Sequence, residues 1–416
     1  MKTLRSVFLL SIFTILFSAC QKQDTSFYKP ISTEEIRIGV LISLSGSGYS
    51  SVESSSVAIA LARQDITGYF ASAGIKEYLV LDIVDTRTDT AEALKQMKSL
   101  YDRGIRMVIG PYTSAELAHV KSFADTHGML VVSPSSVSVS LAQPGDNIFR
   151  LVPSDVIQGK AMSKLLADDK IRVIVPLVRD DVWGNDLVNA TRNDFIKSGG
   201  LVQPAIKYDP ATIDFTTVLD NLHIAVADEL THHNPNEVAV YMISLGEGTT
   251  ILSEAKKHSH LNNVYWYGSS GIAQNASLLN DTTAALFAYT HGLPCPVFGL
   301  DDAAKNLWQP LRDRIAGQIG RIPDVYAFTS YDALWVLIKT YRAAGKDPPI
   351  DVLRNIFINE ANSYFGVSGN TQLDTNGDRA SGNYDFWAVK TDTAGYCWKR
   401  VARYNSLNGT LNRVIR

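Results

Sequence analysis

Short apolar runs rich in β-branched residues alternate with amphipathic segments from residue 36 onward. Leu94, Met97 and Tyr101, for example, lie at positions i, i+3 and i+7, a spacing that puts them on one face of a helix. Strands that alternate with helices form parallel sheets joined by right-handed crossovers. The pattern therefore predicts an α/β fold with doubly wound sheets.

The predicted elements fall into two groups of similar length. Strands are predicted at 36–42, 78–84, 106–109 and 129–132, and then at 173–178, 202–208, 238–243 and 264–267. Helices are predicted between them, and the chain continues with helices at 303–317 and 330–344 and a β segment at 366–401. About 380 residues exceed what one hydrophobic core usually organises, so we expect two lobes.

The first twenty residues follow a different pattern. Lys2 and Arg5 precede an apolar run from Val7 to Phe17, and small residues come next. This order is typical of a secretory signal peptide, and the run is shorter than the roughly 20 residues that span a bilayer. We predict a signal peptide at residues 1–19 and a polar, flexible tether at 20–35.

Charge and cysteine content narrow the function. The chain has 39 basic and 42 acidic residues and a net charge of −3, so no strong positive field favours nucleic acid, and nucleic acid is not a predicted partner. Beyond Cys20 only Cys295 and Cys397 remain. In an oxidising compartment they either pair or stay free, and the sequence leaves both states open.

The chain carries little that is typical of catalysis or metal binding. Gly268-Ser269-Ser270-Gly271 lacks the residue that separates the serine from the second glycine of a nucleophile elbow. Asp374, Asn376 and Asp378 have calcium-loop spacing, but Arg379 stands where the sharp turn requires glycine. No phosphate-binding glycine motif is complete. We therefore predict that the protein is not an enzyme and uses no cofactor or metal.

Short motifs along nearly the whole chain resemble those of the type I periplasmic binding proteins of the leucine/isoleucine/valine-binding kind. They are Ile38-Gly39-Val40, Leu44-Ser45-Gly46, Ile109-Gly110-Pro111, Val132-Ser133-Pro134-Ser135-Ser136, Phe149-Arg150, Pro153-Ser154-Asp155, Tyr331-Asp332-Ala333, Phe365-Gly366-Val367-Ser368-Gly369 and Asp374-Thr375-Asn376-Gly377-Asp378. The resemblance implies two Rossmann-like lobes joined by three crossings, with a ligand in the interlobe cleft and closure by a hinge motion.

The resemblance also implies domain boundaries. The first lobe comprises residues 36–147 and 297–362, and the second comprises residues 148–296 and 363–403. The three crossings are expected near Ile148, Cys295 and Ser363, and residues 404–416 form a C-terminal tail.

Leu16-Phe17-Ser18-Ala19-Cys20 resembles a bacterial lipobox. The resemblance implies that Cys20 becomes the lipidated first residue of the mature chain, and several acyl chains give stable membrane anchoring. The alternative is an ordinary cleaved signal with an incidental cysteine. We expect a lipoprotein of the cell envelope that faces the periplasm. The sequence leaves open whether its anchor lies in the inner or the outer membrane.

In doubly wound sheets, the loops after the strand carboxyl ends form the ligand crevice, where helix N-termini offer free N–H groups. By the resemblance, Ser114 contacts a ligand carboxylate and Trp183 is an aromatic wall residue. Two alternatives are that Ser114 only caps its helix and that Trp183 is structural. The full set of predicted ligand residues is Tyr49, Tyr112, Ser114, Ser135, Ser136, Val137, Trp183, Ser244 and Ser270.

Two positions depart from the family pattern. Val137 stands where a threonine hydroxyl is usual, and Ser270 lies near the place of a glutamate that pairs with the ligand ammonium. Asp180, Asp181 or Glu247 compensates for that glutamate, or else the ligand lacks an amino group, as in an aromatic or aliphatic acid or a small amide.

We therefore predict a lipid-anchored solute-binding protein that captures a small carboxylate-bearing ligand for the permease of an ABC transporter. The alternative is a ligand-free envelope lipoprotein that regulates a partner protein.

Overall fold

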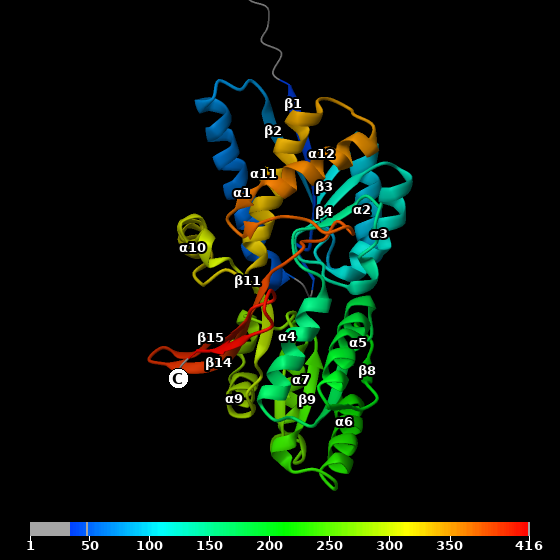
Figure 1. The fold of residues 1–416 in the computed structure, drawn as a ribbon, viewed down its shortest axis with the longest axis vertical. Coiled ribbons are helices and arrows are strands. Elements are labelled where there is room, and N and C mark those ends of the chain that lie inside the picture. Colours follow the sequence, from blue (N-terminus) through cyan, green and yellow to red (C-terminus); the bar gives the residue numbers. More distant parts are fainter. Residues whose placement is uncertain (1–33, 47–48, 415–416) are drawn as a thin grey trace, which may run out of the picture.

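Two lobes lie one above the other in the structure, a computed structural model that describes residues 34–46 and 49–414 (Figure 1). The predicted signal peptide, Cys20 and nearly all of the tether lie outside the described residues, as does the side chain of Tyr49. Within the part of the chain that the structure describes, no helix is both long and apolar enough to cross a bilayer.

The first lobe is built on a parallel sheet with the strand order β2-β1-β3-β4-β5. Its strands are β1 (Glu35–Ile42), β2 (Tyr78–Asp85), β3 (Met107–Ile109), β4 (Leu130–Ser133) and β5 (Ile148–Arg150). Its helices are α1 (Tyr49–Ser72), α2 (Thr90–Asp102), α3 (Ser114–Thr126), α11 (Tyr326–Ala344) and α12 (Ile350–Ser363).

Strand β1 explains the apolar run of the first lobe. Ile38 and Val40 belong to the core with α1, α11 and α12, whereas Leu41 belongs to the core with α2 and α3. Because both faces of the strand are covered, apolar residues are needed at consecutive positions.

The second lobe repeats this arrangement with the strand order β10-β9-β6-β7, and β8 also pairs with β6. Its strands are β6 (Val173–Arg179), β7 (Leu201–Val202), β8 (Ile206–Tyr208), β9 (Val238–Ile243) and β10 (Tyr265–Tyr267). One core contains residues of α4 (Asp155–Asp168) and α5 (Val182–Lys197). The other contains residues of α6 (Thr216–Glu229), α7 (Gly248–Ala255), α8 (Ala276–Asn280) and α9 (Thr282–His291).

The last part of the chain forms an antiparallel sheet with the order β11-β14-β15-β16, and the β14–β15 hairpin projects to the left in Figure 1. Its strands are β11 (Cys295–Gly299), β14 (Asn383–Asp392), β15 (Gly395–Tyr404) and β16 (Leu411–Arg413). The remaining elements are α10 (Lys305–Ile319), the strands β12 (Phe365–Gly366) and β13 (Gly369–Asn370), and 3-10 turns at Val139–Leu141, Pro235–Glu237, Leu261–Asn263 and Asp302–Ala304. Cys295 and Cys397 are both free thiols.

The predicted α/β fold with parallel sheets is confirmed, and several boundaries differ from the prediction. The predicted strand at 202–208 is two strands, β7 and β8, because Pro204 between them has no N–H for a ladder hydrogen bond. Strand β5 pairs with β4 as far as Arg150, so the chain leaves the first sheet after that residue. Residues 411–413 of the predicted tail form β16.

A buried ion pair joins the end of β5 to the turn before β14. Arg150 is fully buried, and its Nε and Nη2 donate to the two carboxylate oxygens of Asp378 at 2.5 Å each. Its Nη1 donates to the carbonyl of Ser138 at 2.6 Å. The segment that enters the second lobe is therefore fixed to a distant part of the chain.

Candidate ligand-binding cleft

A cavity lies between the two lobes, at the carboxyl ends of the parallel strands. Its volume is about 100 Å³. This is somewhat smaller than the roughly 150 Å³ of a cavity that binds benzene in another protein. The first lobe lines it with Ser43, Val52, Tyr112, Thr113, Ser114, Ala115, Ser135 and Val137, and the second with Asp181, Trp183, Leu245, Ser270, Gly271, Ala273, Gln274 and Asn275. The loop before α11 adds Arg321, Asp324 and Tyr326.

The loop between β3 and α3 forms the first-lobe wall. Gly110 has φ +89° there, and a Cβ at this position would lie 2.0 Å from the carbonyl oxygen of Leu41, so only glycine fits. Thr113 then caps α3: its hydroxyl accepts the N–H of Glu116 at 3.2 Å and donates to the Glu116 carboxylate at 2.6 Å. These bonds, with the return bond from the Thr113 N–H to the Glu116 carboxylate, form a capping box at the N-terminus of α3, beside the cavity.

The hydroxyl of Ser114 connects the two first-lobe loops. It lies 2.9 Å from the hydroxyl of Ser136 and accepts the backbone N–H groups of Val137 and Ser138 at 3.3 and 3.2 Å. Ser114 is thus both the first residue of α3 and an anchor for the 133–138 loop. A ligand oxygen at this place would meet hydroxyl and N–H donors at a helix N-terminus.

Trp183 forms the second-lobe wall. Asp181 caps α5 by accepting the N–H of Gly184 at 2.8 Å, which places Trp183 in the first helical turn. Only 6% of Trp183 is exposed, and a Cβ on Gly271 would lie 2.6 Å from its indole ring. Gly271 therefore leaves the space in which the indole packs beside the cavity.

A buried carboxyl supports both walls of the cleft. Asp155 is fully buried at the start of α4, and its backbone N–H donates to the carbonyl of Val137 at 2.8 Å. Its Oδ1 accepts Gln158 Nε2 at 2.5 Å, and Gln158 Oε1 accepts the N–H of Ser270 at 3.1 Å. Burial raises the pKa of Asp155 well above its usual range. The network fixes Ser270 relative to the first-lobe loop.

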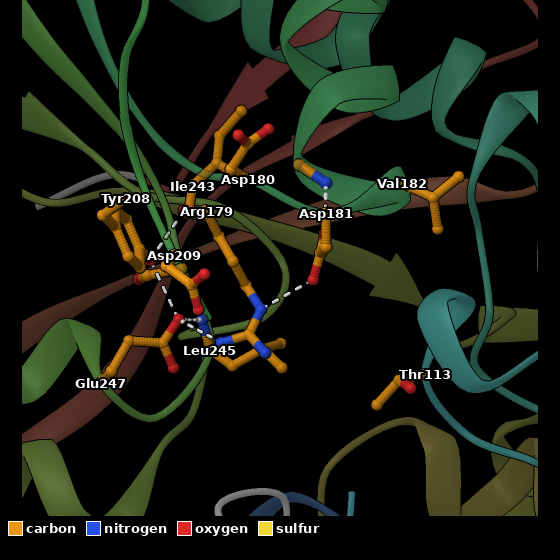
Figure 2. Close-up of polar contacts among 12 residues, drawn as sticks. Thr113, Arg179, Asp180, Asp181, Val182, Tyr208, Asp209, Ile243, Leu245 and Glu247 are labelled. Atoms are coloured by element: carbon orange, nitrogen blue, oxygen red, sulfur yellow. Dashed lines mark hydrogen bonds and ion pairs between the residues drawn. The ribbon is translucent and has the colours of Figure 1, made fainter. Parts of the chain in front are cut away.

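An ion-pair cluster lies behind the second-lobe wall (Figure 2). Arg179 Nε donates to Asp181 at 2.7 Å, and its Nη1 donates to Glu247 Oε1 at 2.9 Å. The same oxygen accepts the Tyr208 hydroxyl at 2.9 Å and the N–H of Leu245 at 3.1 Å. Burial opposes the Arg179 cation, but Glu247 and Asp181 outweigh it and raise its pKa. Arg179 therefore stays charged and holds both carboxylates.

A family model described as "Receptor family ligand binding region" matches residues 55–392. The chain belongs to this family. It is 28% identical to an uncharacterized protein of Methanocaldococcus jannaschii over 418 residues, 96% of this chain and 97% of that protein.

Two solved structures show what fold this receptor-family ligand-binding region has. The leucine-binding protein LivK of Thermotoga maritima has a TM-score of 0.73 at 21% identity, over 89% of this chain and 99% of that one. A solute-binding protein of an ABC transporter from Rhodopseudomonas palustris, in complex with 3,4-dihydroxybenzoic acid, has a TM-score of 0.71 at 15% identity, over 90% and 98%. The predicted type I periplasmic binding protein fold is confirmed.

The cavity of this ligand-binding region brings together six of the nine residues predicted from the sequence. Ser136 and Ser244 are buried beside the cavity and do not line it. Ser136 turns its hydroxyl to Ser114, and Ser244 packs against Gly248. Tyr49 begins α1, and its side chain lies outside the described residues. The six lining residues are Tyr112, Ser114, Ser135, Val137, Trp183 and Ser270.

The loop before α11 was not among the predicted ligand-binding segments. Arg321 Nη2 contacts Glu53 at 2.8 Å, and Asp324 accepts the N–H of Tyr326 at 2.9 Å together with the Ser54 hydroxyl. Burial raises the pKa of Asp324 and of the Tyr326 hydroxyl. This loop joins two helices and follows no strand. The expectation that ligand sites form after the carboxyl ends of strands therefore does not point to it. A search for charged residues just before an apolar helix would have found it.

Residues 34–46 and 49–414 contain no group of three or more His, Cys, Asp or Glu side chains arranged to hold a metal ion.

Proposed function

We propose that the protein is a lipid-anchored, extracytoplasmic solute-binding protein that captures a small carboxylate-bearing ligand in the interlobe cleft and delivers it to an ABC transporter. One observation carries the proposal: the N-terminus of α3, with Ser114, faces a cavity whose opposite wall is the aromatic ring of Trp183. Helix N-termini bind carboxylates without a cationic side chain. An aromatic wall suits the apolar part of a small acid.

The relatives support the same role. The Thermotoga maritima structure is named a leucine-binding protein, and the Rhodopseudomonas palustris structure contains an aromatic acid. The alternative of a ligand-free regulatory module gains no support from a cavity that is lined by both lobes. Membrane anchoring rests on the lipobox resemblance at Cys20, and permease delivery rests on the role named for the relatives.

Ser114→Ala is expected to weaken carboxylate binding about tenfold, since a hydrogen bond to a charged group contributes roughly 1.5 kcal/mol or more. Calorimetric titration of the purified variant with a small acid that binds the wild type measures the change. Ser163→Ala is the matched control, because Ser163 is a buried serine whose hydroxyl donates to the Thr191 carbonyl in the α4–α5 interface. Full retention of affinity in Ser114→Ala would remove Ser114 from the carboxylate site.

A further inference from the structure

The cavity has a carboxylate on each lobe, and each is already held by groups of the protein. On the second lobe, Asp181 receives Arg179 Nε at 2.7 Å and the N–H of Gly184 at 2.8 Å. Arg179 is shared with Glu247, and the two oxygens of Asp181 already accept the guanidinium and the N–H of the helix cap. A ligand cation at Asp181 would have to compete with Arg179.

Asp324, on the first-lobe side, is also hydrogen-bonded within the protein. It accepts the Ser54 hydroxyl and the N–H of Tyr326, and Arg321 lies close enough to favour its charged form. Each carboxylate oxygen of Asp324 thus already accepts one hydrogen bond, and burial raises the pKa of this group. The neighbouring Glu53 already forms an ion pair with Arg321 at 2.8 Å.

Glu247 lies outside the cavity lining. One of its oxygens receives Arg179, Tyr208 and Leu245, and the other is buried without a partner in the described structure. Figure 2 shows Arg179 between Glu247 and Thr113 of the facing lobe. Residues 47–51, whose side chains the structure does not describe, include no acidic residue in the sequence.

The rest of the lining suits an uncharged tail. Both lobes contribute aromatic and aliphatic side chains to the lining. The hydroxyl of Ser270, on the second lobe, lies within hydrogen-bonding range of the Tyr326 hydroxyl. An ammonium buried in such a site without a carboxylate partner is strongly disfavoured, because its hydration is lost and not replaced. The apolar and aromatic lining residues are Val52, Tyr112, Val137, Trp183, Leu245 and Tyr326.

We infer that the cleft selects a small monocarboxylic acid with an aromatic or branched apolar tail and no amino group. This inference rests on the proposed function and narrows its ligand class. The acid group lies at the N-terminus of α3, and the tail lies between Trp183 and the first-lobe side chains.

Two matched ligand pairs test the inference by calorimetric titration of the purified protein: 3-phenylpropanoate against phenylalanine, and 4-methylpentanoate against leucine. Within each pair the molecules differ only by the amino group. We expect the acid without the amino group to bind at least about tenfold more tightly in the pair whose tail fits. Equal or tighter binding of the amino acid would overturn the inference and leave the proposed function standing. Absence of binding by all four would count against both.

Ser270→Glu and Ser270→Gln provide a second test in the same protein, because the two new side chains have nearly the same size. The glutamate variant is expected to reverse the preference within the fitting pair, since it supplies a carboxylate for the ammonium. The glutamine variant is expected to keep the wild-type preference. A wild-type preference in both variants, with a cooperative unfolding transition retained, would contradict the view that a missing carboxylate sets the selection.

Discussion

Asp378→Ala is expected to lower the free energy of unfolding by about 3–5 kcal/mol, because it leaves a buried cation without its partner. Arg150 is fully buried, and both of its contacts with Asp378 are 2.5 Å long. Its other hydrogen bond goes to the uncharged Ser138 carbonyl, and Asp155 also interacts with it electrostatically. Urea unfolding followed by circular dichroism measures the loss.

Asp168→Ala is the control for this variant. Asp168 pairs with Lys164 at 2.9 Å on α4, where the two side chains are 34% and 43% exposed. Exposed pairs of this kind contribute roughly 0–1 kcal/mol, so the control should remain close to the wild type. The double variant R150M/D378L removes the buried charge as well as its partner and should recover part of the loss. An Asp378→Ala protein as stable as the control would contradict the role given to this pair.

Trp183→Ala is expected to lower ligand affinity by about 30-fold or more, corresponding to the 2 kcal/mol or more typical of a buried aromatic anchor. Trp183 is the largest side chain that the second lobe contributes to the cavity, and it is buried against Gly271. Without it the ligand tail loses its aromatic contact and water enters the site. Titration with the tightest-binding small acid measures the effect.

Trp183→Phe separates packing from ligand contact. The smaller ring keeps an aromatic face, so it should lose less than tenfold in affinity. Thermal unfolding of both variants without ligand shows how much of each effect belongs to the fold. Wild-type affinity in Trp183→Ala would exclude the indole from the ligand site.

Much of the fold could be predicted because both sheets are covered on both faces. Continuous apolar runs such as Val238–Ile243 then mark the positions of strands clearly. Thr113 with Glu116 likewise marks the start of a helix. Two elements were missed. The helix α12 begins after Pro349 and buries Leu353, Phe357 and Ala361 at helical spacing, a signal that the prediction overlooked, whereas β16 forms only because β15 lies beside it.

The site was predictable where it follows strand ends. Tyr112, Ser114 and Trp183 each come soon after a strand of the parallel sheets, and topology alone brings such loops together. The sequence could not show that Asp181 and Glu247 share Arg179, since Arg179 and Glu247 lie 68 positions apart. Nor could it place Asp324, which reaches the cavity from a loop between helices.

Thermal unfolding of the purified protein against a panel of amino acids, aromatic and aliphatic acids and small amides tests whether a small carboxylate binds in the cleft. We expect one class of carboxylate to stabilise the protein, by roughly 2.7 kcal/mol when its concentration is 100 times its dissociation constant. The Ser114→Ala variant should require a higher concentration for the same effect. A well-folded protein that no carboxylate stabilises would contradict solute capture and favour the partner-regulating module.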